Sequence, residues 1–284
     1  MSNDSVRRFK DKLAFVLGGA CVVIAMIPLL SILFEVIRNG ISAISIEFLT
    51  SPPGVIGEPG GGIANSIEGS LILIGLTCMM GVPIGIFSGI FLSEFGDNPY
   101  GRTIRFFNDV YAQLPSIVVG ILGYFLVVLP LGHFSALAGA FALSIIMLPI
   151  VARSTEESLK LVPSSIRDAA MALGIRKWRT TVSVVLTTGK GGVVTGLLLA
   201  IARIAGETAP LILTVLGTQL FYSGITSPID ALPLRIYRLA LLPYPYARQQ
   251  GWGAALILIL IVLTLNVGVR VATRGRLNST RSRV

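Results

Sequence analysis

Residues 156–174 read EESLKLVPSSIRDAAMALG and lie at the centre of a polar insert, 152–192, in a chain that is otherwise mostly apolar. An insert of 41 residues inside a compact domain usually forms structure of its own or has a function. The nature of the insert and of the apolar sequence around it decides how the whole chain folds.

The insert carries the signals of one short helix. Ser164 or Ser165 can cap its start, Asp168 lies near that start, and Gly174 can close its end. Apolar and small side chains recur there at spacings of three and four, so they share one helix face: Ile166, Ala169, Ala170 and Leu173. The sequence therefore predicts an amphipathic helix over 164–174, displayed on a membrane surface, with small residues where a partner can approach.

Composition places the rest of the chain in a membrane. The mean hydropathy of the 284 residues is +0.81, and 13% of them are charged, roughly half the usual share. An apolar run of about 20 residues is long enough to cross a bilayer. Six such runs occur, at about 14–36, 69–92, 113–131, 134–151, 193–216 and 253–272. The predicted fold class is therefore an all-α membrane protein with six transmembrane helices.

Several features of these runs have simple structural interpretations. The first run follows basic residues, as a signal peptide does, but it is too long and no A-x-A-like site follows, so we expect a retained anchor. Cys21 and Cys78 lie inside expected spans and are interpreted as small packing residues. Pro115 opens the third span, either as a structural helix start or as a kink in a pore-lining helix. His133, the single histidine, has no second ligand near it in sequence, so no metal site is expected.

Charge sets the expected orientation. With the N-terminus in the cytoplasm, 18 of the 23 Lys and Arg lie inside: four in 1–13, two in 93–112, seven in 152–192 and five in 270–284. The positive-inside rule therefore favours both termini in the cytoplasm. Anionic headgroups account for the pI near 10 without nucleic acid. We expect a cytoplasmic segment 1–13, a six-helix transmembrane domain 14–272 and a basic tail 273–284.

This topology puts two long segments outside, 37–68 and 217–252. Proline and glycine clusters in the first disfavour regular structure. The second contains LPLRIYRLA at 232–240, which predicts a short interfacial helix that Pro243 and Pro245 end. Such segments either dock an external protein or only connect the spans.

The insert also resembles a known family. Asp168-Ala169-Ala170 followed by Gly174 is similar to the EAA loop of ATP-binding-cassette importer permeases, with Asp in place of the usual Glu. In that family the loop forms a coupling helix that seats in a groove of the cytoplasmic ATPase. The resemblance implies ATPase contacts from these residues and Leu173. The residues themselves also allow an ordinary surface helix in which Asp168 only complements the helix dipole.

A second polar feature lies in the fifth expected span, where residues 200–211 read AIARIAGETAPL. Arg203 lies ten residues beyond Val193, roughly 15 Å along a helix, which is near mid-membrane. An arginine there costs about 3 kcal/mol on translocon scales. Glu207 is four residues on, so the two side chains are expected to share a helix face and pair. The pair is either part of a permeation path or a clasp between helices, and Pro210 can kink the span beside it.

The segment from Arg203 to Pro210 resembles the membrane subunits of the bacterial high-affinity phosphate importer. The similarity covers roughly residues 60–272, and the stretch 231–250 resembles one of that importer's two homologous membrane subunits more than the other. It implies a type I ABC importer permease fold in the bacterial inner membrane, with Arg203, Glu207 and Thr208 in the substrate path. The planar donor fork of a guanidinium suits an oxyanion such as phosphate.

The resemblance also implies partners: a homologous second permease, two ATPase subunits, a periplasmic phosphate-binding protein and membrane lipid. No G-x-x-x-x-G-K-[ST] run occurs, so ATP and Mg²⁺ would be bound by the partner ATPase and no cofactor by this chain. No nucleophile–base pair is apparent, so no enzyme active site is expected. Two alternatives remain: an importer of another oxyanion, such as molybdate or sulfate, and an ATP-independent secondary transporter or channel, which would need no coupling helix.

Overall fold

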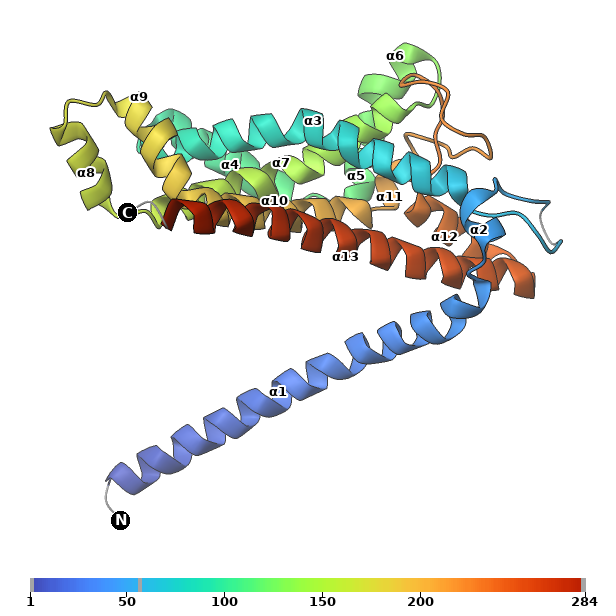
Figure 1. Cartoon of the computed structure of the whole chain (residues 1–284), viewed down its shortest axis with the longest axis horizontal. Coiled ribbons are helices and arrows are strands. Elements are labelled where there is room, and N and C mark those ends of the chain that lie inside the picture. The colour runs from blue at the N-terminus through green and yellow to red at the C-terminus, as the bar shows by residue number, and fades with distance from the viewer. Residues whose placement is uncertain (1–2, 56–57, 282–284) are drawn as a thin grey trace.

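The computed structural model describes the backbone of residues 3–55 and 58–281, and every regular element in these ranges is a helix (Figure 1). The fold class predicted from the sequence is therefore confirmed. The long helices are α1 (Asn3–Gly40), α3 (Ala64–Phe95), α7 (Ala136–Lys160), α10 (Leu186–Ala205) and α13 (Pro245–Arg281). The short elements before α7 are η1 (Ile41–Ala43), α2 (Ile46–Thr50), α4 (Pro99–Gln113), α5 (Ser116–Gly123), η2 (Tyr124–Val128) and α6 (Leu129–Leu131). Those after it are α8 (Ser164–Ala172), α9 (Lys177–Thr180), η3 (Thr181–Val185), α11 (Ala209–Ile212) and α12 (Leu232–Leu241).

Five helical stretches within the described residues are long and apolar enough to cross a membrane: 10–43, 64–95, 136–160, 177–205 and 245–271. A sixth span results if α4 and the helix 116–131 count as one broken span, which bends by 105° at Leu114 and Pro115. Proline disfavours a helical conformation in the residue before it, and this accounts for the break. The predicted number of six spans therefore depends on this bent pair, and the predicted span 113–131 corresponds to its second part.

Helix α7 is the centre of the bundle, and α3 and α10 pack on it through small residues. On α3, Gly81, Gly85 and Gly89 recur every four residues and face α7. A Cβ at Gly85 would lie 2.7 Å from the Cβ of Val151, so the two backbones approach as closely as glycine allows. Small residues at this spacing are typical of helix packing in membranes.

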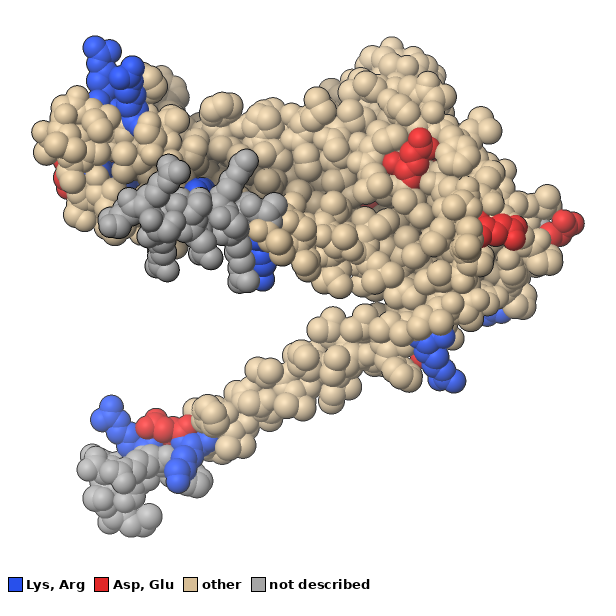
Figure 2. Space-filling view, in the orientation of Figure 1, with Lys and Arg blue, Asp and Glu red and all other residues tan. Residues whose placement is uncertain are grey.

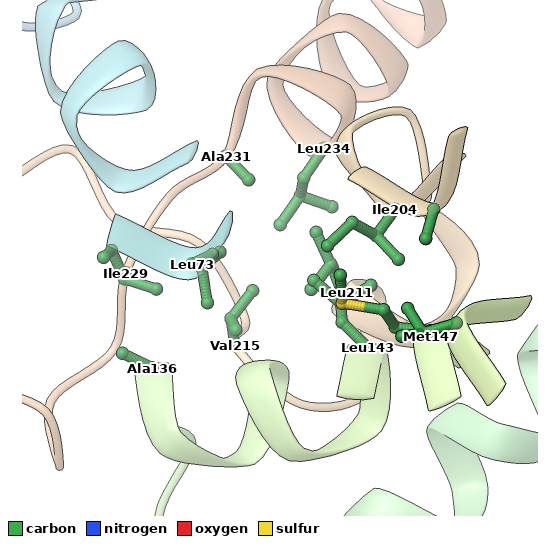
Figure 3. Packing of buried hydrophobic residues seen from close by; sticks show 12 residues of the cluster. Leu73, Ala136, Leu143, Met147, Ile204, Leu211, Val215, Ile229, Ala231 and Leu234 are labelled. Atoms are coloured by element: carbon green, nitrogen blue, oxygen red, sulfur yellow. The ribbon is translucent and has the colours of Figure 1, made fainter. Parts of the chain in front are cut away.

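The main core lies where α3, α7, α10 and α11 meet the segment that leads into α12. Figure 3 shows its side chains converging from these elements, and the largest of them are fully or nearly fully buried: Leu73, Leu143, Met147, Ile204, Leu211 and Leu234. Cys78 packs against this cluster, as predicted. This core fixes the position of the chain reversal after α10.

The fifth span differs from the prediction 193–216. The α9–η3–α10 stretch begins at Lys177 and ends at Ala205, and residues 206–208 are not helical. Pro210 explains the end, because its ring would clash with the carbonyl of Gly206 and it has no N–H to donate. The span therefore starts 16 residues earlier than expected and stops 11 residues earlier.

The polar insert 152–192 is not one loop. Helix α7 continues through Lys160, and the next helix begins at Lys177, so only 161–176 connects them and α8 lies within this connection. Ion pairs at helical spacing support the extension of α7: Arg153 with Glu157 at 3.0 Å and Lys160 with Glu156 at 2.6 Å. Two helices of the bundle thus project beyond the apolar layer and present α8 at their ends.

Helix α1 leaves the bundle at an angle (Figure 1), and the most apolar part of it is entirely exposed in the isolated chain. It contacts the rest of the protein through α13 and η1, at its C-terminal end. Cys21 is exposed on α1, so the prediction that it packs within the chain is wrong: its helix has no neighbour there.

Helix α13 contains the predicted span 253–272 but begins earlier, at Pro245, and its backbone stays helical through Arg281. The last residues of the predicted tail, 282–284, lie outside the described part. The described ends of α1 and α13 both lie at the α8 end of the molecule (Figure 1). Figure 2 shows Lys and Arg gathered at that end, and several Asp and Glu at the opposite end.

The predicted helix at 232–240 is confirmed as α12, and it ends before Pro243. One face of α12 packs into the protein, where Leu232, Leu234 and Leu239 are buried, while Tyr237 and Leu241 are exposed. Its expected place at the membrane interface stays a prediction. The hydroxyl of Ser70 on α3 accepts a hydrogen bond from the backbone N–H of Leu232 at 2.7 Å. The short helix is therefore part of the core at the end opposite to α8.

Candidate functional site

A groove of about 660 Å³ lies between the α4–α5 bend, α7 and α10. Nearly all of its lining is apolar or small, and Arg203 is the one charged residue of the lining: Tyr111, Ala112, Leu114, Ser116, Ile146, Ile150, Leu199, Ala202 and Arg203. The Arg203 side chain is 57% exposed in the isolated chain. The bend at Pro115, for which the sequence allows a structural helix start or a kink in a pore-lining helix, contributes Leu114 and Ser116 to this wall.

The depth of Arg203 follows from its neighbours. Ile146 and Ile150 belong to the apolar part of α7, which runs from Ala136 to the first charged residue of that helix, Arg153. Ile146 is ten residues from the start of α7, roughly 15 Å along the axis. The groove therefore opens within the apolar layer, at the level that the sequence predicts for Arg203.

Arg203 and Glu207 pair as predicted, but not on one helix face. An Nη of Arg203 lies 3.5 Å from a carboxylate oxygen of Glu207, whose side chain is only 14% exposed. Since α10 ends at Ala205, Glu207 lies in the turn after the helix, where its backbone N–H donates to the carbonyl of Ile204 at 3.2 Å. Thr208 precedes α11 without lining the groove. The carboxylate thus fixes a guanidinium whose other side faces the groove.

The short helix predicted over 164–174 is present as α8. Gly174 has a φ of +77°, the left-handed conformation that ends the helix as expected. The capping prediction is wrong: Pro163 occupies the N-cap, and neither Ser164 nor Ser165 caps the helix through its side chain. Asp168 is the fifth residue of α8, beyond the first turn, so it does not cap the helix either.

One side of α8 packs on the bundle and the other is exposed. Ala170 is buried, and Ile166 packs against the cluster formed by Leu159, Val162, Val185 and Val193. Asp168 and Ala169 are exposed, and Leu173 is 82% exposed although it is apolar. The expected common face of Ile166, Ala169, Ala170 and Leu173 is therefore divided between the bundle and the surface, because α8 rests on the bundle along one edge.

Arg167, which the sequence did not single out, anchors α8. Its guanidinium lies 2.9 Å from the carboxylate of Glu94 at the end of α3, and it donates to the carbonyls of Leu159 and Val162 after α7. Carbonyls at helix C-termini lack partners within the helix, and a cation there also complements the dipole. A single side chain thus ties α8 to two helices of the bundle.

Arg105 on α4 repeats this arrangement. It pairs with Glu156 of α7 at 2.8 Å and donates to the carbonyls of Leu92 and Gly96 at the end of α3. Lys160 shares the Glu156 carboxylate. The acidic residues of these pairs are present in the sequence, but nothing in their spacing identifies partners on other helices.

Metal binding finds no support in the described residues, where no group of three His, Cys, Asp or Glu side chains could hold an ion. His133 is exposed near the α6–α7 turn and contacts only the carbonyl of Phe134.

Comparison with known proteins gives consistent results. The family profile of the binding-protein-dependent transport system inner membrane component matches residues 81–275. The phosphate transport system permease protein PstA of Yersinia pestis is 42% identical over 247 residues, which cover 87% of this chain and 84% of the relative. A probable PstA of Methanocaldococcus jannaschii is 34% identical over 89% of this chain and 90% of the relative. The type of membrane subunit that the sequence suggested is thereby confirmed.

Solved structures agree on the fold. An inward-facing form of the MetNI methionine ABC transporter matches with a TM-score of 0.62 and 16% identity, over 75% of this chain and 96% of that one. A bacterial ABC transporter for the import of alginate matches with a TM-score of 0.63 and 15% identity, over 94% of this chain and 98% of that one. At such identities the likeness shows the fold alone. Together with the relatives and the profile, it shows that the chain belongs to the family of binding-protein-dependent transport system inner membrane components.

Proposed function

We propose that the chain is a membrane-spanning subunit of an ATP-driven phosphate importer, and that Arg203 is the residue of this chain that the transported ion passes. The observation that carries the proposal is the single guanidinium in the apolar groove, on a chain 42% identical to a phosphate permease. A guanidinium inside an apolar layer costs free energy, so one that faces a cavity there usually has a function. Glu207 holds Arg203 and offsets its charge while the groove is empty.

The proposed contact with the ion is weak and transient. An ion must leave a permeation path as readily as it enters, so tight binding in the groove would stop transport. One guanidinium that already has a carboxylate neighbour meets this requirement, because phosphate has to compete with Glu207. High-affinity capture then belongs to a separate binding protein outside.

The proposed energy source is a separate ATPase that grips α8. Leu173, Met171 and Trp178 are exposed apolar side chains around α8 and α9, and Asp168 is exposed beside them. Such a patch at the basic end of the protein suits a cytoplasmic partner. We propose two ATPase subunits, which bind ATP and Mg²⁺, a homologous second permease that completes the pathway, and a periplasmic phosphate-binding protein. This chain has no catalytic role of its own.

Radiolabelled phosphate uptake tests the proposal in right-side-out vesicles that contain the whole complex, with ATP inside and the binding protein outside. Deletion of this subunit is expected to abolish ATP-dependent uptake. Arg203→Gln is expected to lower uptake by at least about tenfold, equivalent to 1.4 kcal/mol, with normal amounts of assembled complex. Unchanged uptake in Arg203→Gln would remove Arg203 from the pathway. Uptake of sulfate or molybdate in place of phosphate would favour the alternative cargo.

A further inference from the structure

A second polar cavity lies at the opposite end of the bundle from α8. It has a volume of about 220 Å³ and lies between the segment 217–219, α12, the start of α13 and four residues that precede α3: Gly54, Val55, Glu58 and Gly60. Its charged lining residues are Arg235 and Arg238 of α12 and Glu58. Figure 1 shows α12 at this end, far from α8. If α8 is cytoplasmic, the cavity faces the outside.

The two arginines differ from four others of the chain, which pair with carboxylates. Arg105, Arg153, Arg167 and Arg203 each pair with a carboxylate. Within the described part of the chain, neither Arg235 nor Arg238 makes an ion pair or a side-chain hydrogen bond, and the Nε of Arg235 is buried without a partner. A buried donor without a partner costs roughly 1–3 kcal/mol, and more when it is charged.

Two carboxylates lie near these arginines: Glu58 in the cavity lining, and Asp230 outside it. Asp230 is buried beside α12, and its carboxylate accepts a hydrogen bond from the hydroxyl of Ser66 at 2.6 Å, away from the cavity lining. Burial raises the pKa of Asp230, because it disfavours the charged form of the carboxylate. Burial is the main cause that lowers the pKa of Arg235; the negative charge of Asp230 opposes this, and the positive charge of Arg238 lowers the pKa by a smaller amount. Arg235 is therefore attracted by Asp230 and repelled by Arg238, and within the described residues neither arginine makes an ion pair.

Arg238 packs against Gly217. Gly217 has a φ of +73°, and a Cβ at that position would lie 2.6 Å from an Nη of Arg238. The absence of a side chain at position 217 therefore leaves room for the guanidinium. Hydroxyl and amide groups complete the polar lining: Tyr246, whose oxygen accepts from the N–H of Gly60 at 3.0 Å and keeps its own proton to donate, and Gln219 and Thr218.

We propose that this cavity binds a tetrahedral oxyanion, inorganic phosphate, on the outer side of the membrane before the ion enters the Arg203 groove. Two donor forks and a phenolic hydroxyl match the acceptor oxygens of such an ion, and the ion would relieve the repulsion between the arginines. Glu58 is exposed at the rim, so water screens its charge, and the net charge of the lining stays positive. The identity of the ion rests on the proposed function; the presence of an anion site does not.

The test uses a cysteine at Gln219, an exposed residue of the lining, in the full complex in right-side-out vesicles without ATP or binding protein. Cys21 and Cys78 are replaced by alanine. A membrane-impermeant maleimide labels position 219 while phosphate is raised to 20 mM at constant ionic strength with chloride. We expect phosphate to slow labelling at least threefold. Labelling that phosphate does not slow would overturn the proposal.

Variants identify the arginines as the cause. Arg238→Gln is expected to abolish protection by phosphate, and Arg238→Lys, which keeps the charge but not the fork, to raise the half-protecting concentration about tenfold. Arg248→Gln is the matched control: it removes an outer arginine near the cavity that does not line it, and protection should remain. Equal protection in both Arg238 variants and in the control would overturn the proposal.

The result is separable from the proposed function, because the labelling needs no transport. Loss of uptake in Arg203→Gln without protection at position 219 rejects only the outer site. Protection at position 219 in a complex that takes up no phosphate with ATP rejects the transport assignment and keeps the anion site.

Discussion

Two arginines, each paired with a glutamate, differ in what surrounds them. Arg167 is 20% exposed and its partner Glu94 is 6% exposed, and all of its donors face carboxylate or carbonyl oxygens. Arg203 is 57% exposed and its distance to Glu207 is longer, 3.5 Å. Each nitrogen of the Arg167 guanidinium donates to an oxygen of the protein, so Arg167 has a structural role. Arg203 keeps donors free toward a groove, which is what a transient ion contact requires.

The Glu207→Gln variant tests whether Glu207 only holds the chain reversal together or also takes part in the passage of the ion. The amide keeps the shape and can still accept a hydrogen bond, but it no longer competes with phosphate for Arg203. If Glu207 only clasps the chain reversal, uptake per assembled complex should stay within twofold of the natural protein. If Glu207 releases the ion, we expect a lower turnover at saturating phosphate, about tenfold, with equal amounts of complex on a gel-filtration column. This second result is our prediction.

Arg167→Gln should loosen α8 without changing the apolar bundle. Removal of one partner leaves the buried Glu94 carboxylate without its cation, and such losses cost about 3 kcal/mol. Hydrogen exchange of the α8 amides should accelerate, while exchange in α3 and α7 above the ion pair stays slow. Arg153→Gln, which removes an exposed pair at the same end, is the control and should leave α8 protected. Equal protection of α8 in both variants would contradict an anchoring role.

At the scale of elements, α8 shows what can be read from a sequence and what cannot. Its existence, its approximate length and its end at Gly174 follow from local pattern, and all are observed. Its cap was misassigned because Pro163 takes that position, and its orientation was misassigned because α8 rests on clusters contributed by α7 and η3. Arg167 was missed for the same reason: its partners are 73 and five to eight residues away in sequence.

Asp168→Arg should uncouple the two activities of the complex. Asp168 is exposed on α8 and does not cap it, so the substitution leaves the fold intact and changes only the charge that a partner meets. We expect ATP hydrolysis to continue in vesicles while phosphate uptake falls about tenfold. Ser165→Arg, which adds the same cation at another exposed position of α8, should have a smaller effect. Uptake that still follows hydrolysis in Asp168→Arg would show that this carboxylate makes no essential contact.

For the whole molecule, the apolar runs predicted the helical, membrane-spanning architecture well, because their length depends on the bilayer and not on packing. The orientation that the distribution of charge favours stays a prediction. The boundaries failed where helices continue past the apolar layer, as α7 does to Lys160, or stop inside it, as α10 does at Ala205. The groove could not be predicted, since its walls come from Leu114, Ile146 and Leu199 on three separate elements. In the sequence, Arg203 indicates the position of the groove, because a charged side chain within the bilayer costs free energy.

The orientation of the molecule can be tested with two cysteines. Ser165→Cys on α8 should react with an impermeant maleimide only in inverted vesicles, because basic residues gather at that end (Figure 2). Gln219→Cys at the other end should react only in right-side-out vesicles. Reaction of Ser165→Cys from the outside of intact cells would rule out any grip on α8 by a cytoplasmic ATPase.

The isolated position of α1 has a consequence for the life of the protein in the cell. Because α1 contacts its own chain only near one end, a newly synthesised subunit exposes an apolar helix before assembly. We expect membrane proteases to degrade an unassembled subunit quickly, until another subunit covers α1. The cellular level of this subunit would then be limited by the synthesis of the least abundant partner subunit and not by its own rate of synthesis.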